Sequence, residues 1–327
     1  MSKSIDVTAL GELLIDFTEN GTSGQGNPLL EANPGGAPCN VLAMLKRLGK
    51  NVAFIGKVGD DMFGKQLTEA VQEVGIDIRN LVVDKEVHTT LAFVHTYPDG
   101  DRDFSFYRNP GADMMLKKEE VQEDLISDSR IFHFGTLSST HEDVREATRY
   151  AIEVAKEAGC IFSFDPNLRP PLWSNLEDAK AEIEYGFSKC DVLKISDNEI
   201  TFMTGEEDLD AGIHKIIEEY KIPLVFATFG PNGSKAYCDG VEVFEEGFLN
   251  PRTIETTGAG DTFCASALHH VLKYGIKMDA AQLKELLTFA NAAASLVTTR
   301  KGALCVMPTP EEVLKYIKVS GRKLRES

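Results

Sequence analysis

The sequence predicts an α/β protein built on a mainly parallel sheet, and two observations lead to this fold class. Short runs of β-branched and aromatic residues alternate along the chain with longer segments of helical periodicity. Such alternation is typical of βαβ units, in which a helix connects two parallel strands and covers the sheet. Of the 327 residues, 43% are apolar and 26% are charged, which is the composition of a globular protein with a large core.

The expected elements follow one another in a regular order. We expect strands at residues 7–17, 52–59, 131–135, 161–167, 191–196 and 224–230. Helices are expected at residues 40–48, 64–74, 144–158 and 283–297. Two segments depart from this order: residues 17–33 are rich in Gly, Asn and Pro, and residues 88–108 alternate around a Pro-Asp-Gly turn. The second segment is typical of a β-hairpin, which would be a lid, a dimer contact or an inserted surface hairpin.

Charge and cysteine content exclude several classes of protein. The chain has 34 basic and 51 acidic residues, a formal net charge of -17. We therefore expect no nucleic-acid partner, because a phosphate backbone is bound by clustered Lys and Arg. No apolar run approaches the roughly 20 residues of a membrane span. The six cysteines are scattered without a CxxC pair, which indicates reduced thiols and a cytoplasmic protein.

The strongest local motif is Thr-Thr-Gly-Ala-Gly-Asp at residues 256–261, which leads into an amphipathic helical stretch. Small residues before a helix leave free N–H groups at its N-terminus, where the helix dipole favours an anion. Asp261 at this place is either an N-terminal cap or a general base directed at a substrate hydroxyl. Gly258 and Gly260, on either side of Ala259, favour the second interpretation because a phosphate must approach the backbone closely.

Three further segments contain candidate ligand contacts. Gly35 and Gly36 precede Asn40, whose amide suits hydroxyl groups, although by itself this segment is an ordinary loop before a helix. Asp16 closes the first apolar run, where a carboxylate binds hydroxyl groups or is merely a residue of a solvated turn. Residues 59–66 nearly match a P-loop, but Gln66 lacks the required hydroxyl, so we expect a loop followed by a helix start.

The ends of the later expected strands carry more polar residues. These are Asp165, Asn167 and Arg169, then Ser196 and Glu199, then Thr228, Gly230 and Gly233. In an open parallel sheet the strand ends form the crevice that binds ligands. An anion-binding helix terminus, a carboxylate base, a guanidinium and a second acid together suit phosphoryl transfer, with Glu199 as a magnesium contact.

At this point the motifs resemble a known family. The segment GGAPCN at residues 35–40, with AMLKRLG and FIGKVGDDMFG after it, and TTGAGD at residues 256–261 are similar to the two signatures of the ribokinase/PfkB carbohydrate kinases. The resemblance covers residues 11 to about 310. Within the family, FYRNPGADMML, DPNLRPPLW and KISDNE are most similar to the fructokinase branch, and the 2-keto-3-deoxygluconate kinases are next.

The resemblance implies a ribokinase-like three-layer α/β/α sandwich with a mainly parallel sheet and a small β-sheet lid. Residues 1–327 would form one domain, with the lid at about 11–34 and 88–112. The implied activity is that of an ATP-dependent fructokinase, which phosphorylates D-fructose at the 6-hydroxyl. One alternative is a 2-keto-3-deoxygluconate kinase, with Arg108 or Arg169 pairing with the substrate carboxylate. A sugar-sensing protein without catalysis is the alternative from another class, and a redox Rossmann enzyme lacks its GxGxxG motif.

The resemblance also assigns roles to residues. Asp261 matches the catalytic base, and Gly258, Ala259 and Gly260 match the anion hole. The positions that match sugar or phosphate contacts are Asp16, Gly35, Gly36, Asn40, Phe104, Arg108 and Arg169. The positions that match ATP contacts are Ser196, Thr228, Gly230, Gly233 and Asn291.

The expected cofactors are Mg²⁺, which accompanies ATP, and K⁺. Glu199 matches the magnesium-linked acid of the family's NxxE motif and would act through water, but Ser196 replaces the motif's asparagine. Glu255 stands where relatives have Asp at a position linked to a monovalent cation, and Thr257 and the Gly302 loop are further candidate contacts. The lid hairpin can pair across a two-fold axis, so we expect a homodimer.

Overall fold

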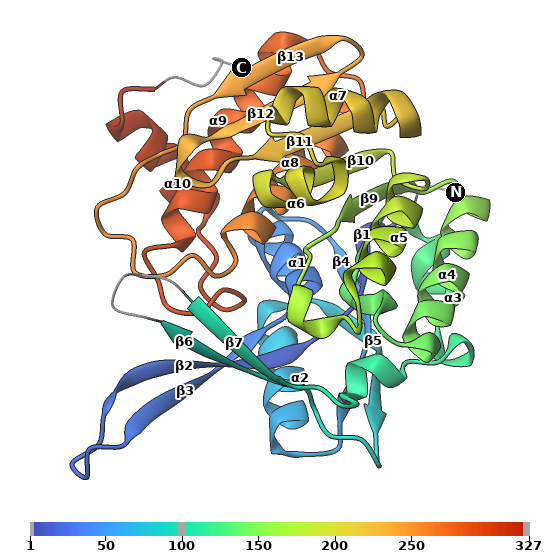
Figure 1. Ribbon diagram of the computed structural model, residues 1–327, viewed down its shortest axis with the longest axis vertical. Helices are drawn as coiled ribbons and strands as arrows, with labels where there is room; N and C mark the ends of the chain where they lie inside the picture. Colours follow the sequence, from blue (N-terminus) through green and yellow to red (C-terminus); the bar gives the residue numbers. More distant parts are fainter. Residues whose placement is uncertain (1–2, 97–101, 323–327) are drawn as a thin grey trace.

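The computed structural model describes residues 3–96 and 102–322 and contains two separate β-sheets (Figure 1). The larger sheet has nine strands in the order β13-β12-β11-β10-β9-β8-β1-β4-β5. Neighbouring strands are parallel except in the pairs β11–β12 and β12–β13, so the mainly parallel sheet is confirmed. Its strands are β1 (Ile5–Leu10), β4 (Val52–Gly59), β5 (Asp77–Asp84), β8 (Ser129–Gly135), β9 (Ile161–Asp165), β10 (Val192–Ser196), β11 (Leu224–Thr228), β12 (Ser234–Cys238) and β13 (Val241–Glu245).

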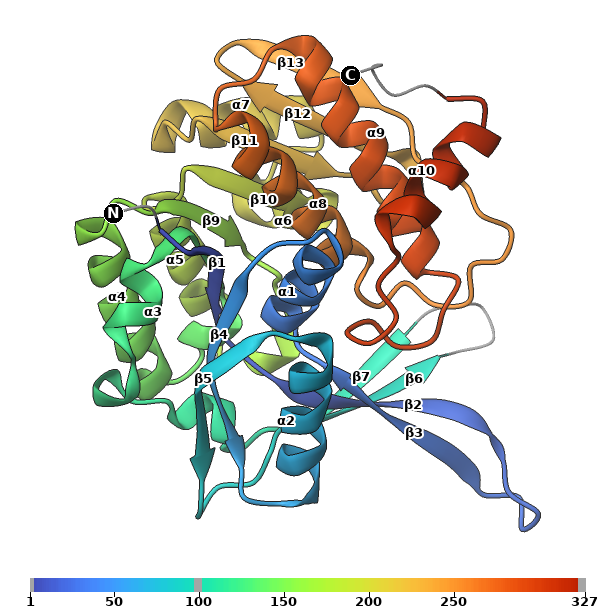
Figure 2. The same ribbon diagram turned by 180° about the vertical axis from the view of Figure 1, so that it is seen from behind.

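Helices cover both faces of this sheet, as the two opposite views show (Figures 1 and 2). One face packs against α1 (Ala37–Arg47), α2 (Met62–Val74), α8 (Ala259–Tyr274), α9 (Ala280–Val297) and α10 (Pro310–Val319). The other packs against α3 (Glu123–Ser127), α4 (Glu142–Glu157), α5 (Leu176–Phe187), α6 (Asp197–Thr204) and α7 (Leu209–Tyr220). Short 3-10 helices are η1 (Ala112–Met115), η2 (Lys118–Glu120), η3 (Leu137–Ser139), η4 (Pro170–Leu172) and η5 (Gly230–Asn232). None of the helices in the described residues is long and apolar enough to span a membrane.

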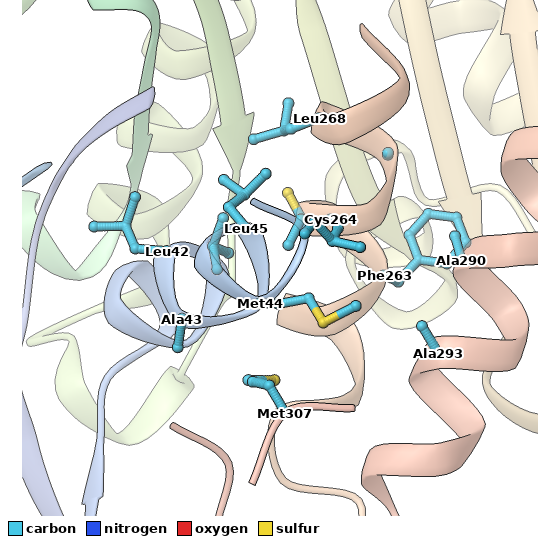
Figure 3. Packing of buried hydrophobic residues seen from close by; sticks show 14 of the residues in the cluster. Leu42, Ala43, Met44, Leu45, Phe263, Cys264, Leu268, Ala290, Ala293 and Met307 are labelled. Atoms are coloured by element: carbon cyan, nitrogen blue, oxygen red, sulfur yellow. The ribbon is translucent and has the colours of Figure 1, made fainter. Parts of the chain in front are cut away.

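The central strands are apolar on both sides because both faces of the sheet are covered. On β11, Phe226 belongs to the core on the α8 side, whereas Val225 belongs to the core on the opposite side. This explains why the central strands read as continuous apolar runs instead of alternating with polar residues. Figure 3 shows the first core, where side chains of α1, such as Leu45, lie beside Cys264 and Leu268 of α8.

Helix α2 begins in the segment that nearly matched a P-loop. Asp61 is its N-cap and accepts hydrogen bonds from the backbone N–H groups of Phe63 (3.0 Å) and Gly64 (2.8 Å). The cap satisfies two of the donors that a helix leaves free at its start. The expected loop followed by a helix start is therefore confirmed.

The smaller sheet consists of two strand pairs from distant parts of the sequence. Its strands are β2 (Leu14–Thr22), β3 (Pro28–Gly35), β6 (Leu91–Thr96) and β7 (Arg102–Tyr107), in the order β3-β2-β6-β7. The pair β6–β7 is antiparallel, as expected for a β-hairpin in residues 88–108, and the expected Pro-Asp-Gly turn lies outside the described residues. In both views the small sheet projects from one end of the α/β body (Figures 1 and 2).

The position of Asp16 corrects one expectation. The single strand expected at residues 7–17 is two strands, because β1 ends at Leu10 and the chain enters the small sheet at Leu14. Asp16 therefore lies on β2, paired with Asn33 of β3, and not at the end of a strand of the parallel sheet. Residues 9 to 15 are all buried, so the only change in polarity where the chain passes from one sheet to the other is Glu12.

Candidate active site

The two glycine-rich motifs meet at the carboxyl end of the large sheet. Helix α1 begins directly after Gly36, and helix α8 begins directly after Gly258. Asn40 of α1 donates a hydrogen bond to the carboxylate of Asp261 on α8, with Nδ2 and Oδ2 2.8 Å apart. The N-termini of two helices thus lie side by side, and the positive ends of both helix dipoles favour an anion.

Asp261 is the third residue of α8, and its carboxylate does not cap the helix. The N-cap is Gly258, whose φ of 75° is a left-handed conformation that glycine adopts without strain. The carboxylate of Asp261 instead accepts the hydrogen bond from Asn40. The interpretation of Asp261 as a simple cap is therefore wrong.

The surroundings of Asp261 make its carboxylate a stronger base than an exposed one. Burial raises its pKa to about 6, and the charge of Asp165 also raises it. The hydrogen bond from Asn40 and the cations of Lys194 and Arg169 have the opposite effect and lower the pKa. Above pH 6 the group is mostly ionised, and its pKa is close enough to neutrality for it to accept a proton from a hydroxyl.

Gly35 and Gly36 lie between Asp16 and the start of α1. A Cβ on Gly35 would collide with the Asp16 carboxylate, and a Cβ on Gly36, whose φ is 119°, would collide with the carbonyl oxygen of Glu12. The Glu12 carboxylate accepts a hydrogen bond from the N–H of Ala37 at 2.8 Å. Glu12 therefore fixes the glycine loop against the segment that connects β1 to β2.

The Asp16 carboxylate is buried beside this loop. Burial raises its pKa to about 7, the Arg169 cation lowers it, and the charges of Asp261 and Glu255 raise it further. Among the residues that the structure describes, none donates a hydrogen bond to this carboxylate. Its acceptor oxygens are therefore available to the hydroxyl groups of a ligand.

Arg108 and Phe104 were also expected to contact the sugar or phosphate. Arg108 is almost fully buried and donates to Asp113 (2.6 Å), to Thr140 Oγ1 (2.7 Å) and to the carbonyl of Leu137 (3.0 Å). Most of its N–H donors are used within the protein, so it does not reach into the site as a free cation. Phe104 lies on β7, and its side chain falls outside the described part of the structure.

A cavity of about 630 Å³ adjoins the N-terminus of α8. Its walls come from the turn after β11, from the segment before α8 and from α9, and they include Thr228, Gly230, Gly233, Phe248, Asn250, Thr256, Ala259, Gly260, Phe263, Asn291 and Ser295. This volume is in the range of small-molecule and cofactor sites. Four of the five expected ATP contacts line it, and Ser196 does not.

Asn291 supports a wall of this cavity through its amide group. Its Oδ1 accepts from Ser234 Oγ at 2.8 Å, and its Nδ2 donates to the carbonyls of Glu245 (3.0 Å) and Glu246 (3.3 Å). These bonds join α9 to the sheet edge and to the segment after β13. Asn291 therefore shapes the cavity, with both polar atoms of its side chain already engaged.

The expected magnesium acid lies at the start of α6. Glu199 Oε2 accepts hydrogen bonds from the N–H and the hydroxyl of Ser196, each at 2.8 Å, and Glu199 Oε1 accepts one from the N–H of Leu168 at 2.8 Å. Ser196 and Glu199 thus form a capping box. Both carboxylate oxygens of Glu199 therefore already accept hydrogen bonds from the protein.

The residues expected to bind a monovalent cation lie in the loop before α8. Glu255 Oε1 accepts a hydrogen bond from the N–H of Gly302 at 2.8 Å, which joins this loop to the segment after α9. Thr257 follows in the same loop, directly before Gly258. In residues 3–96 and 102–322, no group of three or more His, Cys, Asp or Glu side chains could hold a metal ion.

Two charged residues of the site were not identified from the sequence. Glu12 holds the glycine loop, and Lys194 forms an ion pair with Asp165, with Nζ and Oδ2 3.1 Å apart. Each interrupts an apolar run, and that interruption is the signal that could have identified them. A charged side chain in a buried segment must find a partner, because an unpaired buried charge is strongly destabilising.

Glycines 258 and 260 predict different mutational effects. For Gly260→Val we expect turnover to fall at least 100-fold with little change in melting temperature, because the new Cβ would meet only the end of the Lys194 side chain, 3.2 Å away, and no backbone atom outside its own helix. For Gly258→Val we expect a lower melting temperature as well, since φ is 75° and the Cβ would lie 2.5 Å from that of Ala303. Thermal unfolding and turnover of both variants test this, and equal melting temperatures would contradict it.

Comparison with known proteins places these features in a family. Residues 4–310 match the description "pfkB family carbohydrate kinase". The chain is 40% identical over 317 residues to "Probable fructokinase-2" of Arabidopsis thaliana, with 96% of each chain covered.

Solved structures give the same result. The chain matches the structure of a fructokinase with bound ATP from Xylella fastidiosa with a TM-score of 0.88 and 31% identity, covering 98% of this chain and 100% of that one. It matches a double-mutant fructokinase from Vibrio cholerae O395, solved with fructose, ADP and a potassium ion, with a TM-score of 0.84 and 29% identity, covering 97% and 99%. The expected ribokinase-like fold is confirmed, and the chain belongs to the PfkB family of carbohydrate kinases.

Proposed function

We propose that this protein is an ATP-dependent fructokinase, which converts D-fructose and ATP into fructose 6-phosphate and ADP. The observation that carries the proposal is the position of Asp261 between two binding regions. It lies beside Asp16 and the glycine loop on one side, and Ala259 and Gly260 before it line the 630 Å³ cavity on the other. The similarity to proteins named fructokinases supports fructose as the sugar.

In the proposed mechanism, the sugar lies against Asp16, Gly35, Gly36 and Asn40. Asp261 accepts the proton of the sugar's 6-hydroxyl while the oxygen of that hydroxyl attacks the γ-phosphorus of ATP. The N–H groups at the start of α8, from Gly258 to Gly260, hold the transferring phosphoryl group and stabilise its charge. Arg169, whose charge acts on both Asp16 and Asp261, would bind at the junction of sugar and phosphate.

The residues fit a magnesium ion that enters with the nucleotide. Mg²⁺ is commonly held by substrate phosphates, water and one or two carboxylates, and it neutralises the charge of the phosphate chain. Both oxygens of Glu199 accept protein hydrogen bonds, so it would hold such an ion through water. For potassium, Glu255, Thr257 and the loop at Gly302 are the proposed contacts, and the potassium ion in the Vibrio cholerae structure supports this choice.

A sugar panel tests the proposed function. ADP release would be measured with fructose, glucose, ribose and 2-keto-3-deoxygluconate, with Mg²⁺ present and with K⁺ or Na⁺ as the monovalent cation. We expect the highest kcat/KM with fructose, and phosphorus NMR should show a 6-phosphate as the product. Preference for the keto acid, or no ADP release with any sugar, would overturn the proposal.

We also propose that the small sheet acts as a lid on the single domain and joins two copies of the chain in a homodimer. Its strands β2 and β6 stack Phe17 on Phe93, with ring centroids 4.8 Å apart, and Tyr107 next to them is 67% exposed. Exposed aromatic groups of this kind are typical of interfaces. Light scattering should give a dimer that Tyr107→Lys weakens, and a monomer in the unmodified protein would contradict the proposal.

The cytoplasm is the proposed location. All six cysteines are free thiols, and five of them are buried. Free thiols suit a reducing compartment, where disulfides do not persist.

A further inference from the structure

Lys194 is a buried cation that the mechanism above does not use. It is the third residue of the central strand β10, and its side chain is only 9% exposed. Its Nζ lies 3.1 Å from Oδ2 and 3.2 Å from Oδ1 of Asp165, at the end of the neighbouring strand β9. Burying such a pair removes two charges from water, which costs free energy that their attraction only partly recovers. The pair by itself is therefore weak evidence that Lys194 stabilises the fold.

The Lys194 ammonium lies against the first turn of α8. A Cβ placed on Gly260 would be 3.2 Å from Nζ. Gly260 precedes the proposed base Asp261 and lines the 630 Å³ cavity. The ammonium is not part of the cavity wall, but it lies directly behind Gly260, next to the helix N-terminus where the mechanism places the transferring phosphoryl group.

The hydrogen-bonding capacity of the ammonium is not fully used. An ammonium has three donors, and in residues 3–96 and 102–322 the acceptors for Lys194 are the two oxygens of Asp165. Lys57, a second buried lysine, differs in this respect. It binds Asp84 (3.2 Å), Glu120 (2.9 Å) and the carbonyl of Met115 (3.0 Å). Lys57 thus has an acceptor for each donor, whereas Lys194 keeps one donor for a ligand.

The charges around Lys194 keep it protonated. Burial favours the neutral amine, but the charges of Asp165 on β9, Glu199 on α6, and Cys264 and Asp261 on α8 outweigh this effect and raise the pKa of Lys194. A permanent cation beside the α8 N-terminus supplies positive charge in a protein whose net charge is -17.

We propose that Lys194 is a catalytic residue whose ammonium contacts the γ-phosphoryl group during transfer, and that Asp165 is the positioning residue that holds this ammonium in place. The inference rests on the proposed kinase function. During transfer, the bond from the γ-phosphorus to the β–γ bridging oxygen breaks, and a bond to the sugar hydroxyl oxygen forms. The hydroxyl proton goes to Asp261, the electron pair of the broken bond stays on ADP, and Lys194 keeps its proton throughout.

The test compares nucleotides with and without a γ-phosphate. For Lys194→Met we expect turnover to fall about 100-fold or more, the typical effect of removing one donor to a developing charge. Affinity for the non-hydrolysable analogue AMP-PNP should fall at least tenfold, while affinity for ADP and the KM for fructose change less than threefold. Lys194→Arg should recover part of the turnover.

Two further variants separate this role from stability. Lys57→Met also removes a buried, paired lysine, and we expect it to lower the melting temperature but to leave turnover within threefold. Asp165→Asn/Lys194→Met removes both charges of the pair, so it leaves no orphaned carboxylate if Lys194→Met alone does not fold. This double variant should bind ADP normally and bind AMP-PNP no more tightly than ADP.

The pH profile of turnover tests the role of Asp165 separately. Its charge raises the pKa of Asp261, so Asp165→Asn should move the acid limb of the turnover profile to lower pH, which a merely structural role would not do. Unchanged preference of Lys194→Met for AMP-PNP over ADP, or equal loss of turnover in Lys57→Met, would overturn the proposal. The binding measurements need no sugar, so they decide the role of Lys194 even if fructose proves not to be the substrate.

Discussion

Asp261→Asn is expected to lower turnover by about 10²- to 10⁴-fold, because a positioned general base contributes this much. Asparagine has nearly the same shape as aspartate and can still accept the hydrogen bond from Asn40, so the N-terminus of α8 should keep its structure. The KM for fructose should change little. Steady-state kinetics of the variant measure the effect, and turnover within tenfold of the unmodified enzyme, in a folded variant, would contradict the role of Asp261 as the base.

The same substitution should leave the protein at least as stable at pH 8. Folding raises the pKa of Asp261 from 3.8 to about 6, so the folded protein binds this proton more tightly than the unfolded chain. Stability is therefore lost as pH rises from about 4 to 6, and the ionised group destabilises the fold above that range. Asparagine carries no charge, so the melting temperature of the variant relative to the unmodified protein should increase from pH 4 to pH 8.

Asp191→Asn is a matched control for both measurements. Asp191 is also a partly buried aspartate with a raised pKa, and it accepts a hydrogen bond from the N–H of Phe162 at 2.8 Å. It lies directly before β10, at the opposite end of that strand from Ser196. Turnover of this variant should stay normal, which shows that the loss in Asp261→Asn comes from the position of the carboxylate and not from removing a buried acid.

Unmodified enzyme should lose turnover below about pH 6 as Asp261 takes up a proton. A protonated carboxyl cannot accept the proton of the sugar hydroxyl, so turnover should fall tenfold for each further pH unit. The pH profile of kcat at saturating fructose and ATP measures this. An acid limb centred near pH 4 would contradict this, because it would show that burial does not raise the pKa of Asp261.

The sequence predicted the large sheet well because its elements have strong local signals. The helices expected at residues 144–158 and 283–297 correspond to α4 and α9, and the runs at 191–196 and 224–230 contain β10 and β11. The helices bury one stripe of side chains and the strands bury both faces. The periodicity and composition of each segment therefore show in its local sequence. The small sheet was predicted only in part, since its pairing joins β2 to β6 across more than 70 residues.

The site could be predicted less completely because its geometry depends on partners that are distant in sequence. The motif around Asp261 is visible locally, but its hydrogen bond to Asn40 spans 221 positions. Arg108 was expected to face a substrate, and no local pattern shows that Asp113 and Thr140 take up its guanidinium. Lys194 does have a local signal, because it interrupts an apolar strand, but the sequence does not show that its side chain lies beside Gly260.

Asp16→Ala is expected to raise the KM for fructose about 100-fold, which corresponds to the loss of two hydrogen bonds to a charged acceptor at about 1.5 kcal/mol each. The carboxylate of Asp16 is buried and has no donor among the described residues, so a ligand's hydroxyl groups are its natural partners. Affinity for ADP should be unchanged, because Asp16 lies on β2 and does not line the nucleotide cavity.

Stability provides an independent check on Asp16. Folding raises the pKa of this group from 3.8 to about 7, so its ionised form also destabilises the folded protein above neutrality. Asp16→Asn, which keeps the size of the side chain, should therefore raise the melting temperature at pH 8 while it weakens fructose binding. Asp6→Asn, at the start of β1, is a control that should not change the KM, since Asp6 binds Arg130 and the N–H of Asn51. If Asp16→Ala bound fructose normally, the hydroxyl contacts would have to come from the α1 side of the site, and the small sheet would not take part in recognising the sugar.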